Sequence, residues 1–403
     1  MLVAIRKKRR TAVNYYSLER FDNWKSRVPE YFDYDLVFSY EHLVISAYFC
    51  LRGVRWKTSV KNFAFQLHLK CDQLYDELVT LTFVIKTNTI FIIYERGKLR
   101  VINSIHIRER VVQKCLCKFC LNPVLSRTFI YDNGASQKNK GTTFAIKRVK
   151  RLLGEYYRKY GTEGYVIRFD FKSYFDSIPR ETALQLVGEY IDDERILNLV
   201  RSMVYINSDD HGLNLGSEVS QTLAVFYTTK ICHYIKDKLR IRYYVQYMDD
   251  GWILVRTKEE AVEVINAIEE VSQKWGLKLN KKKTFYLPLK RGFTFLQKRF
   301  LLKDTGKIIV RISRSSVTRM YSKLKWWFGR ETSGEADHKQ VEQYYKSMVG
   351  NIKKYDTCKL RRNLRLMWKE HYGYEPPRVG KNAKKLDNKK SGNRTTTQVK
   401  KAA

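Results

Sequence analysis

The sequence predicts an α+β fold in which an antiparallel sheet is backed by helices. Three observations support this prediction. A β-rich run, residues 164–170, ends at Asp170, and a β-hairpin is predicted over residues 241–255. The residues between them have the apolar periodicity of helices. This order of strand, helices and hairpin lets the two strand regions lie side by side in one sheet.

The segments before this sheet alternate between helices and one hairpin. Residues 1–35 form a basic N-terminal extension. Charged turn residues 95–98 separate two β-rich runs, which predicts a hairpin. The predicted elements are helices over 40–50 and 62–78, strands over 89–94 and 99–105, a helix that begins at Ile107, and a basic helix over 142–160.

The segments after Asp170 are mostly helical. The predicted elements are helices over 182–191 and 193–204, a long helix after Gln221, a helix over 259–275, strands over 277–285 and 292–300, and helices over 315–328 and 338–372. Residues 376–403 are polar, basic and low in complexity, which predicts a disordered tail. For this tail, a non-specific RNA contact and plain solvated disorder are equally weighted.

The charge of the chain indicates a polyanionic partner. The 403 residues contain 77 Lys and Arg against 41 Asp and Glu, a formal net charge of +36. Aromatic residues are also abundant, with 28 Tyr, 20 Phe and 7 Trp. Basic and aromatic side chains together suit a nucleic-acid strand, whose phosphates and base faces can both be held. No apolar run approaches the roughly 20 residues that span a bilayer, so no membrane partner is expected.

The cysteines predict a reduced, cytoplasmic protein. Their number, seven, is odd, which is unusual for a disulfide framework. Cys115, Cys117 and Cys120 are spaced C-x-C-x-x-C, but no fourth cysteine or histidine follows at finger-like spacing. We favour buried free thiols in an apolar helix over a zinc site.

Three carboxylates are candidate metal ligands. Asp170 ends a predicted strand, and Asp249 and Asp250 lie at the tip of the hairpin. Neighbouring carboxylates repel one another unless a cation lies between them, and oxygen-only ligands suit Mg²⁺. Two Mg²⁺ ions held by these residues, with the main-chain carbonyl of Phe171 as a further ligand, would support in-line phosphoryl transfer. The alternative for the hairpin tip alone is a solvated acidic turn.

These motifs resemble those of reverse transcriptases, in the same order along the chain. Phe169-Asp-Phe-Lys-Ser-Tyr-Phe-Asp176, Gly216-Ser-Glu-Val-Ser220 and Tyr247-Met-Asp-Asp250 are similar to the family's palm motifs, and Gly276 to Thr284 to the block that follows them. Phe295-Leu296 resembles the start of the primer-grip hairpin, although Gln297 stands where the family has a glycine. By this resemblance, Tyr247 and Met248 contact the primer and template, with core packing as the alternative for Tyr247.

The resemblance also implies a set of nucleotide-binding residues. Phe175 matches the aromatic residue that excludes a 2′-hydroxyl, with core packing as the alternative. Lys98 and Arg100 match residues that hold the triphosphate, although a solvated strand face is an equally weighted interpretation. Leu215 and Gln221 replace the family's usual glutamine and proline around Gly216. The full implied set is Lys98, Arg100, Phe175, Leu215, Gly216, Gln221 and Lys283.

The fold implied by the resemblance is a right-hand polymerase with fingers, palm and thumb. We expect the N-terminal extension over 1–35, fingers with the start of the palm over 36–160, palm over 161–300, a helical thumb over 301–375, and the tail over 376–403. The expected activity is RNA-directed DNA synthesis with two Mg²⁺ ions, for which Mn²⁺ can substitute. The expected partners are a template RNA, the RNA/cDNA duplex, dNTPs and a small accessory protein.

The Leu215 and Gln221 pattern is most similar to the bacterial reverse transcriptases of diversity-generating retroelements, which copy RNA with errors at adenines. Loss of a polar contact to the nascent base pair weakens discrimination between bases, which agrees with that role. The first alternative is a phage-defence reverse transcriptase. An alternative of another class is a catalytically idle RNA-binding protein on a polymerase scaffold.

Overall fold

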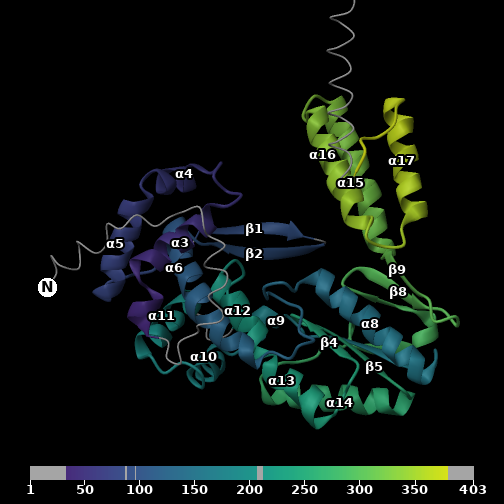
Figure 1. Ribbon diagram of the computed structural model, residues 1–403, viewed down its shortest axis with the longest axis horizontal. Helices are drawn as coiled ribbons and strands as arrows, with labels where there is room; N and C mark the ends of the chain where they lie inside the picture. Colours follow the sequence, from purple (N-terminus) through teal and green to yellow (C-terminus); the bar gives the residue numbers. More distant parts are fainter. Residues whose placement is uncertain (1–32, 87–88, 96, 207–211, 380–403) are drawn as a thin grey trace, which may run out of the picture. The chain divides into compact units, whose positions relative to one another are not determined.

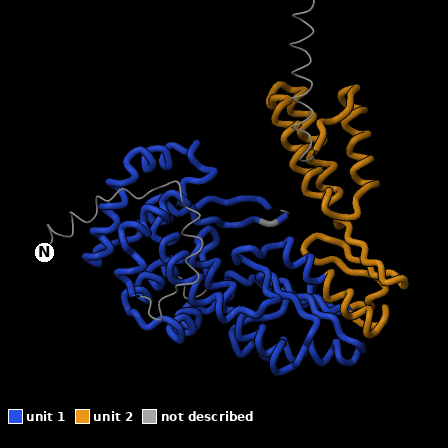
Figure 2. Tube along the Cα trace, in the orientation of Figure 1, with its two compact units in different colours: residues 1–149, 166–286 blue, residues 150–165, 287–403 orange. Residues whose placement is uncertain are grey.

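The computed structural model describes residues 33–86, 89–95, 97–206 and 212–379, which form two compact units (Figure 2). Unit 1 contains the described residues up to 149 together with 166–286, and unit 2 contains 150–165 and those from 287 onward. Within these ranges no helix is both long enough and apolar enough to cross a membrane. The predicted N-terminal extension and basic tail lie almost entirely outside the described residues.

A four-stranded sheet carries the predicted carboxylates. Its order is β4-β5-β3-β6, so the neighbours β3 and β5 bring the first strand beside the hairpin, as the sequence predicts (Figure 1). The strands are β3 (Tyr165–Asp170), β4 (Tyr244–Tyr247), β5 (Asp250–Val255) and β6 (Phe285–Pro288). Val166 and Ile167 on β3 and Trp252 and Ile253 on β5 are fully buried, so β-branched and aromatic side chains anchor the sheet on both strands.

The second sheet of unit 1 is the predicted two-stranded hairpin. It consists of β1 (Thr89–Glu95) and β2 (Lys98–Ser104), which pair antiparallel from Thr89 opposite Ser104 to Glu95 opposite Lys98. All seven residues of β1 are exposed. The hairpin is therefore held to the rest of unit 1 mainly at its base.

The helices of unit 1 agree closely with the amphipathic periods of the sequence. The basic helix α8 (Thr142–Tyr160), which continues into unit 2, has the predicted bounds. The others are α2 (Tyr34–Val37), α3 (Tyr40–Leu51), α4 (Thr58–Phe65), α5 (Leu67–Val79), α6 (Ile107–Leu116), α7 (Asn122–Leu125), α9 (Tyr174–Ser177), α10 (Arg180–Gly188), α11 (Glu194–Val204), α12 (Glu218–Tyr227), α13 (Thr229–His233) and α14 (Lys258–Lys274). Short π-helical and 3₁₀ turns complete the set: Cys117–Leu121, Tyr234–Lys238 and Ser126–Thr128.

Three elements that the sequence predicts as continuous in unit 1 are interrupted in the structure. The predicted strand over 277–285 is mostly turn: only Leu279 forms a bridge, to Phe171, and the three consecutive lysines 281–283 turn away before β6 begins at Phe285. The predicted helix over 62–78 is broken at Gln66 into α4 and α5. The long helix after Gln221 is divided into α12, α13 and the π-helical turn.

Unit 2 contains a three-stranded antiparallel sheet and three long helices. The sheet has the order β7-β8-β9, with β7 (Phe293–Phe295), β8 (Lys298–Leu302) and β9 (Ile308–Ile312), and a 3₁₀ turn (Leu289–Arg291) precedes it. The helices are α15 (Arg314–Thr332), α16 (His338–Ile352) and α17 (Cys358–Tyr372). They pack around Leu324, Val341 and Trp368, each fully buried. The single helix predicted over 338–372 is therefore two, because Asp356 turns to bond the backbone of Val310.

The cysteine cluster is buried, as the sequence predicts. Cys115, Cys117 and Cys120 are free thiols with no exposed surface. The Cys115 thiol donates a hydrogen bond to the carbonyl of Val37 at 3.1 Å. Burial raises the pKa of Cys120 to about 12, so this thiol is protonated at neutral pH. No His, Cys, Asp or Glu side chains in the described ranges form a ready group of three metal ligands.

Candidate active site

Asp170 lies at the buried end of β3. The strand is buried along most of its length, and Asp170 itself is only 5% exposed. Its backbone carbonyl accepts a hydrogen bond from Asn280 N at 2.7 Å, and its carboxylate accepts one from Lys283 Nζ at 2.6 Å. A buried carboxylate needs such a partner. The segment around Asn280 is therefore attached to the strand end, and Lys283, one of the predicted nucleotide-binding residues, is paired with Asp170.

Asp249 lies in the two-residue turn between β4 and β5. Because Tyr247 pairs with Asp250, the turn consists of Met248 and Asp249. Met248 has a φ of 53°, and a positive φ at the first central residue matches a type II′ turn, where glycine is usual. A methionine at this position is strained, so neighbouring contacts must hold the turn in place.

Gln246 holds this turn from beneath. Its side chain is 1% exposed, accepts a hydrogen bond from the Tyr244 hydroxyl at 2.7 Å, and donates one to the Met248 carbonyl at 2.5 Å. Its backbone is also fixed, because its amide donates to Asp132 O at 3.1 Å and its carbonyl accepts from Gly134 N at 2.9 Å. The turn at residues 131–134 thus fastens the edge of β4.

Two half-buried cations hold that edge segment in turn. The carboxylate of Asp132 forms ion pairs with Arg148 of α8 and with Lys236, whose ammonium lies at 2.9 Å. Gln246, Asp132 and Arg148 were not predicted, because each reaches its partner across a long chain separation or from within a strand. The basic character of the predicted helix over 142–160 was the only sequence signal for any of them.

Asp170, Asp249 and Asp250 form one electrostatic group. Burial, together with the nearby charges of Asp170 and Asp250, raises the pKa of Asp249 to about 6. Burial also raises the pKa of Asp250, while Arg168, whose Nη2 lies 2.7 Å from the carboxylate, opposes the rise. The structure therefore brings together the three carboxylates that the sequence places eighty residues apart.

This donor set suits a divalent cation. Carboxylates that are destabilised by burial and mutual repulsion gain most from a bound positive charge. Two of them already face a protein cation, Asp170 with Lys283 and Asp250 with Arg168. Phe171, the predicted carbonyl ligand, is buried and forms a β-bridge with Leu279. The backbones of its neighbours Asp170 and Lys172 are hydrogen-bonded to the same segment.

Phe175 is not a core residue. Its side chain is half-buried, and its ring contacts the Tyr174 ring edge-on at 5.8 Å. Its carbonyl accepts a hydrogen bond from Leu213 N at 2.7 Å, so the loop that leads to Leu215 and Gly216 lies beside it. The side chain is therefore partly accessible, and its role against a 2′-hydroxyl stays a prediction beside the packing alternative.

The base of the β1–β2 hairpin meets the same loop. Asn103 N donates to the Leu215 carbonyl at 3.0 Å, and the Asn103 side-chain amide donates to Asn214 Oδ1 at 3.0 Å. Gly216 has a φ of 111°, and a Cβ there would overlap the Asn103 backbone. Only glycine allows this approach. Three predicted nucleotide-binding residues, Phe175, Leu215 and Gly216, are thus brought together.

A cavity of about 360 Å³ lies next to this loop. Gly216 and the exposed Gln221 line it together with Arg110, Gln113 and Lys114 of α6. The Gln113 side chain is 1% exposed and accepts hydrogen bonds from Ser217 Oγ and Glu218 N, each at 3.2 Å. The predicted glycine motif is therefore fixed from one side by α6 and open on the other.

The remaining predicted residues of unit 1 lie on the two hairpins, Lys98 and Arg100 on β2 and Tyr247 and Met248 at the Asp249 turn. The guanidinium of Arg100 pairs with Glu95 across the hairpin at 3.1 Å, and the side chain of Lys98 lies outside the described residues. Tyr247 is half-buried, and burial raises its pKa. Met248 is also half-buried.

In unit 2, Phe295 is buried and Leu296 is half-buried. Leu296 and Gln297 have φ of 45° and 63° and close the β7–β8 hairpin, since Phe295 pairs with Lys298. Positive φ at both central residues is the pattern of a type I′ turn. Gln297 therefore adopts the backbone conformation for which a glycine would be favoured, and the predicted hairpin forms without one.

Comparison with known proteins identifies the family. Residues 85–297, more than half of the chain, match the family model described as reverse transcriptase (RNA-dependent DNA polymerase). No curated protein matches the chain. Two similar solved structures are apo telomerase from Candida tropicalis, truncated from the C-terminal domain, and telomerase from Candida albicans in complex with the TWJ fragment of telomeric RNA.

The telomerase matches are distant. The first has 15% identity and a TM-score of 0.43 over 60% of this chain and 60% of that chain; the second has 13% identity and a TM-score of 0.45 over 76% and 61%. The chain thus spans about three fifths of the length of these structures. Members of the matched family generally use divalent metal ions and a nucleic-acid template. On the match over residues 85–297, the chain belongs to the reverse transcriptase family.

Proposed function

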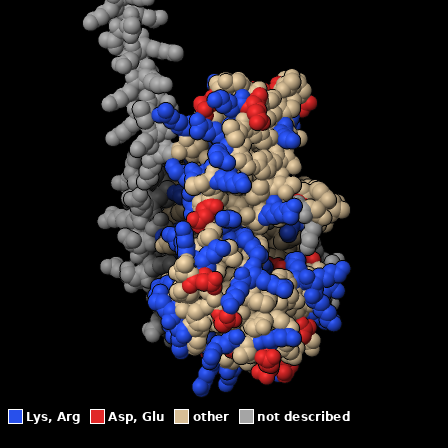
Figure 3. All heavy atoms as spheres, turned by 90° about the vertical axis from the view of Figure 1, so that its right-hand side faces the viewer, with Lys and Arg blue, Asp and Glu red and all other residues tan. Residues whose placement is uncertain are grey.

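We propose that this chain is an RNA-directed DNA polymerase whose centre is Asp170, Asp249 and Asp250. The observation that carries the proposal is the mutual destabilisation of these carboxylates at a strand end and a hairpin tip. Burying like charges is costly, and a divalent cation bound between them offsets that cost. The strongly basic surface supports a polyanionic partner, since Lys and Arg cover more of the face in Figure 3 than Asp and Glu.

In the proposed mechanism the three aspartates, with the Phe171 carbonyl, hold two Mg²⁺ ions. When bound, these ions activate the primer 3′-hydroxyl and neutralise the leaving pyrophosphate. Arg168 keeps the carboxylate of Asp250 oriented, and Gln246 keeps the Met248–Asp249 turn in place. Lys283, whose ammonium is paired with Asp170 at 2.6 Å, would be the cation next to a leaving pyrophosphate if metal ions took over that carboxylate.

Substrate selection is assigned to the group around Gly216. The half-buried ring of Phe175 excludes a 2′-hydroxyl, so deoxynucleotides are preferred. Gly216 and Gln221 contact the incoming nucleotide, with Lys98 and Arg100 on the triphosphate. We assign Tyr247, Met248, Phe295 and Leu296 to the primer and template. The architecture that fits these roles is a right hand, with fingers over 36–160, palm over 161–300 and thumb over 301–375.

The biology we favour is error-prone copying in a diversity-generating retroelement, with a template RNA and a small accessory protein. It rests on Leu215, which is apolar and half-buried where a polar side chain would contact the nascent base pair. A phage-defence role is the alternative for the same chemistry. The pairings of Lys283 and Arg168 with the carboxylates favour one other candidate, an idle RNA-binding scaffold, because they stabilise the group without metal.

One experiment separates these candidates. A primer on an adenine-containing RNA template is extended with dNTPs and Mg²⁺, and the products are sequenced, with Asp249→Ala/Asp250→Ala as the control. We expect metal-dependent cDNA with errors concentrated opposite template adenines. Accurate cDNA would keep the polymerase and favour defence or another retroelement. No product, even with the native RNA and partners supplied, would favour the scaffold.

A further inference from the structure

A groove of about 670 Å³ lies between α4, α5 and the start of α6, in unit 1. Its floor is apolar, formed by Phe63, Leu74 and Ile107, each at most 5% exposed. Its rim is polar and aromatic, and we call these residues the groove rim: Asn62, Phe65, Gln66, Lys70, Lys86 and His106. A volume of this size suits a ligand of nucleotide dimensions.

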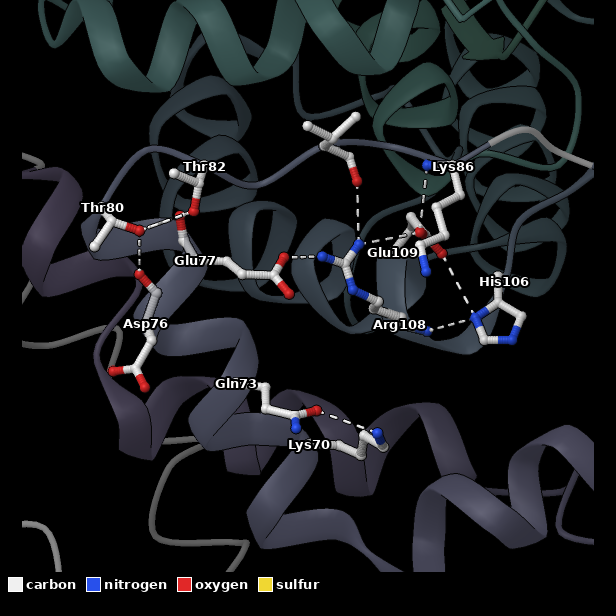
Figure 4. A network of polar contacts seen from close by, with 11 residues as sticks. Lys70, Gln73, Asp76, Glu77, Thr80, Thr82, Lys86, His106, Arg108 and Glu109 are labelled. Carbon is white, nitrogen blue, oxygen red and sulfur yellow. Dashed lines mark hydrogen bonds and ion pairs between the residues drawn. The ribbon is translucent and has the colours of Figure 1, made fainter.

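One wall of the groove is a fixed polar network (Figure 4). Arg108 donates to the Val84 carbonyl at 3.1 Å and to the Glu109 carboxylate at 3.2 Å, and it forms an ion pair with Glu77. Glu109 is 1% exposed and also accepts from Lys86 N at 3.5 Å. The charge of Arg108 is therefore neutralised within the wall, and this network holds the start of α6 against the end of α5.

The rim, by contrast, carries groups that are free for a ligand. Across the described ranges, no hydrogen bond or ion pair engages the side-chain amides of Asn62 and Gln66 or the ammonium of Lys86. Lys70 Nζ donates only to the neutral Gln73 Oε1, at 3.1 Å (Figure 4). Phe65 is 91% exposed. An almost fully exposed phenylalanine among unengaged amides and lysines that have no acidic partner is the composition that holds a stacked base and its phosphates.

We propose that this groove binds single-stranded RNA. An unpaired base stacks on Phe65, the amides of Asn62 and Gln66 bond its edge as donor and acceptor, and the ammonium groups of Lys70 and Lys86 contact the flanking phosphates. The base must be unpaired, because a paired base exposes no face to a side chain. The identity of the ligand rests on the proposed function, since a template RNA is the nucleic acid that such an enzyme recruits.

The groove is distinct from the polymerase motifs. Helices α4 and α5 precede residue 85, where the match to the reverse transcriptase family begins, while Lys86 and the lining residues at the start of α6 fall within it. Four of the six rim residues therefore belong to a part of this chain that the family model does not cover. The site is a recruitment surface that this chain adds to the family's shared region.

The test measures RNA binding with the catalytic cleft already filled. The full chain is first saturated with an unlabelled RNA/DNA hybrid that ends in a dideoxynucleotide, and a fluorescein-labelled, unstructured 12-nucleotide RNA is then titrated by anisotropy. Phe65→Ala should weaken binding about tenfold, since stacking contributes roughly 1–3 kcal/mol per base. Lys70→Gln/Lys86→Gln should lower the slope of affinity against salt by about 1.4, as expected for two lost phosphate contacts.

Leu69→Ala is the matched control, because Leu69 is a 54% exposed apolar residue of α5 that does not line the groove. It should leave binding unchanged. Wild-type affinity in Phe65→Ala, equal weakening by Leu69→Ala, or equal competition by duplex RNA would each overturn the proposal. Primer extension is measured on the same preparations. If wild type extends no primer but Phe65→Ala still weakens RNA binding, the proposed function is contradicted while RNA binding in the groove is supported.

Discussion

Asp249→Asn should stabilise the metal-free protein while removing its proposed activity. Burial and the charges of Asp170 and Asp250 raise the pKa of Asp249 from 3.8 to about 6. The ionised form is therefore disfavoured in the folded state by roughly 3 kcal/mol, at about 1.4 kcal/mol for each pKa unit. An asparagine has nearly the same shape and no charge, so it avoids this cost.

The upward shift of the Asp249 pKa determines how stability depends on pH. Because the folded-state pKa is raised, the folded chain holds a proton at Asp249 that the unfolded chain releases between pH 4 and 6. The wild-type free energy of unfolding therefore loses this contribution as pH rises through that window. Asp249→Asn should match wild type below about pH 4 and exceed it by up to roughly 3 kcal/mol above pH 6.

The assay is denaturant unfolding in EDTA and in Mg²⁺, from pH 4 to 8. Mg²⁺ should raise the stability of wild type more than that of Asp249→Asn, and its affinity for wild type should fall below about pH 6, where a proton competes. Asp250→Asn is the matched control: it leaves Arg168 without its partner at 2.7 Å, so its gain should be smaller. A difference between Asp249→Asn and wild type that is absent or independent of pH would refute this reasoning.

Three further predictions concern positioning and specificity. Gln246→Leu should cost about 1–3 kcal/mol and lower kcat more than KM, because the Met248 carbonyl loses its donor and the buried Tyr244 hydroxyl loses its acceptor. Tyr227→Phe, which removes a buried hydroxyl bonded to Trp275 O at 2.6 Å, should lower stability without changing kcat. Gly251→Ala should cost about 1–3 kcal/mol or more in urea unfolding, because its methyl group would overlap the Phe169 ring, and Phe169→Leu should restore part of the loss. Phe175→Val should raise ribonucleotide incorporation relative to deoxynucleotide incorporation in single-nucleotide extension; an unchanged ratio would place the sugar selection elsewhere.

The parts of the fold that local pattern determines could be predicted from sequence. Helix α8 has the predicted bounds because its apolar period is unbroken, and the β4–β5 hairpin forms where β-rich runs flank two aspartates and a glycine. The role of that glycine could not be predicted. Gly251 is required because the ring of Phe169, eighty residues earlier, lies against it. Such close approaches depend on which strands are neighbours.

The parts that depend on long-range partners were predicted incompletely or wrongly. The alternating residues before Phe285 predicted a strand, but Asn280 N bonds the Asp170 carbonyl and redirects the chain into a turn. The three aspartates were placed together correctly, yet their pairing with Lys283 and Arg168 is a property of the packed site. No sequence pattern points to Gln246, because its role is to bond the carbonyl of Met248 in the strained turn.

The most direct test of the two-metal centre is the number of Mn²⁺ ions bound to the chain with primer–template and a non-hydrolysable dNTP, counted by electron paramagnetic resonance, together with single-turnover extension. We predict two ions for wild type and fewer for Asp249→Asn, with extension at least about a hundredfold slower in that variant. Two ions retained by Asp249→Asn, or extension within tenfold of wild type, would place the chemistry outside the Asp170, Asp249 and Asp250 group.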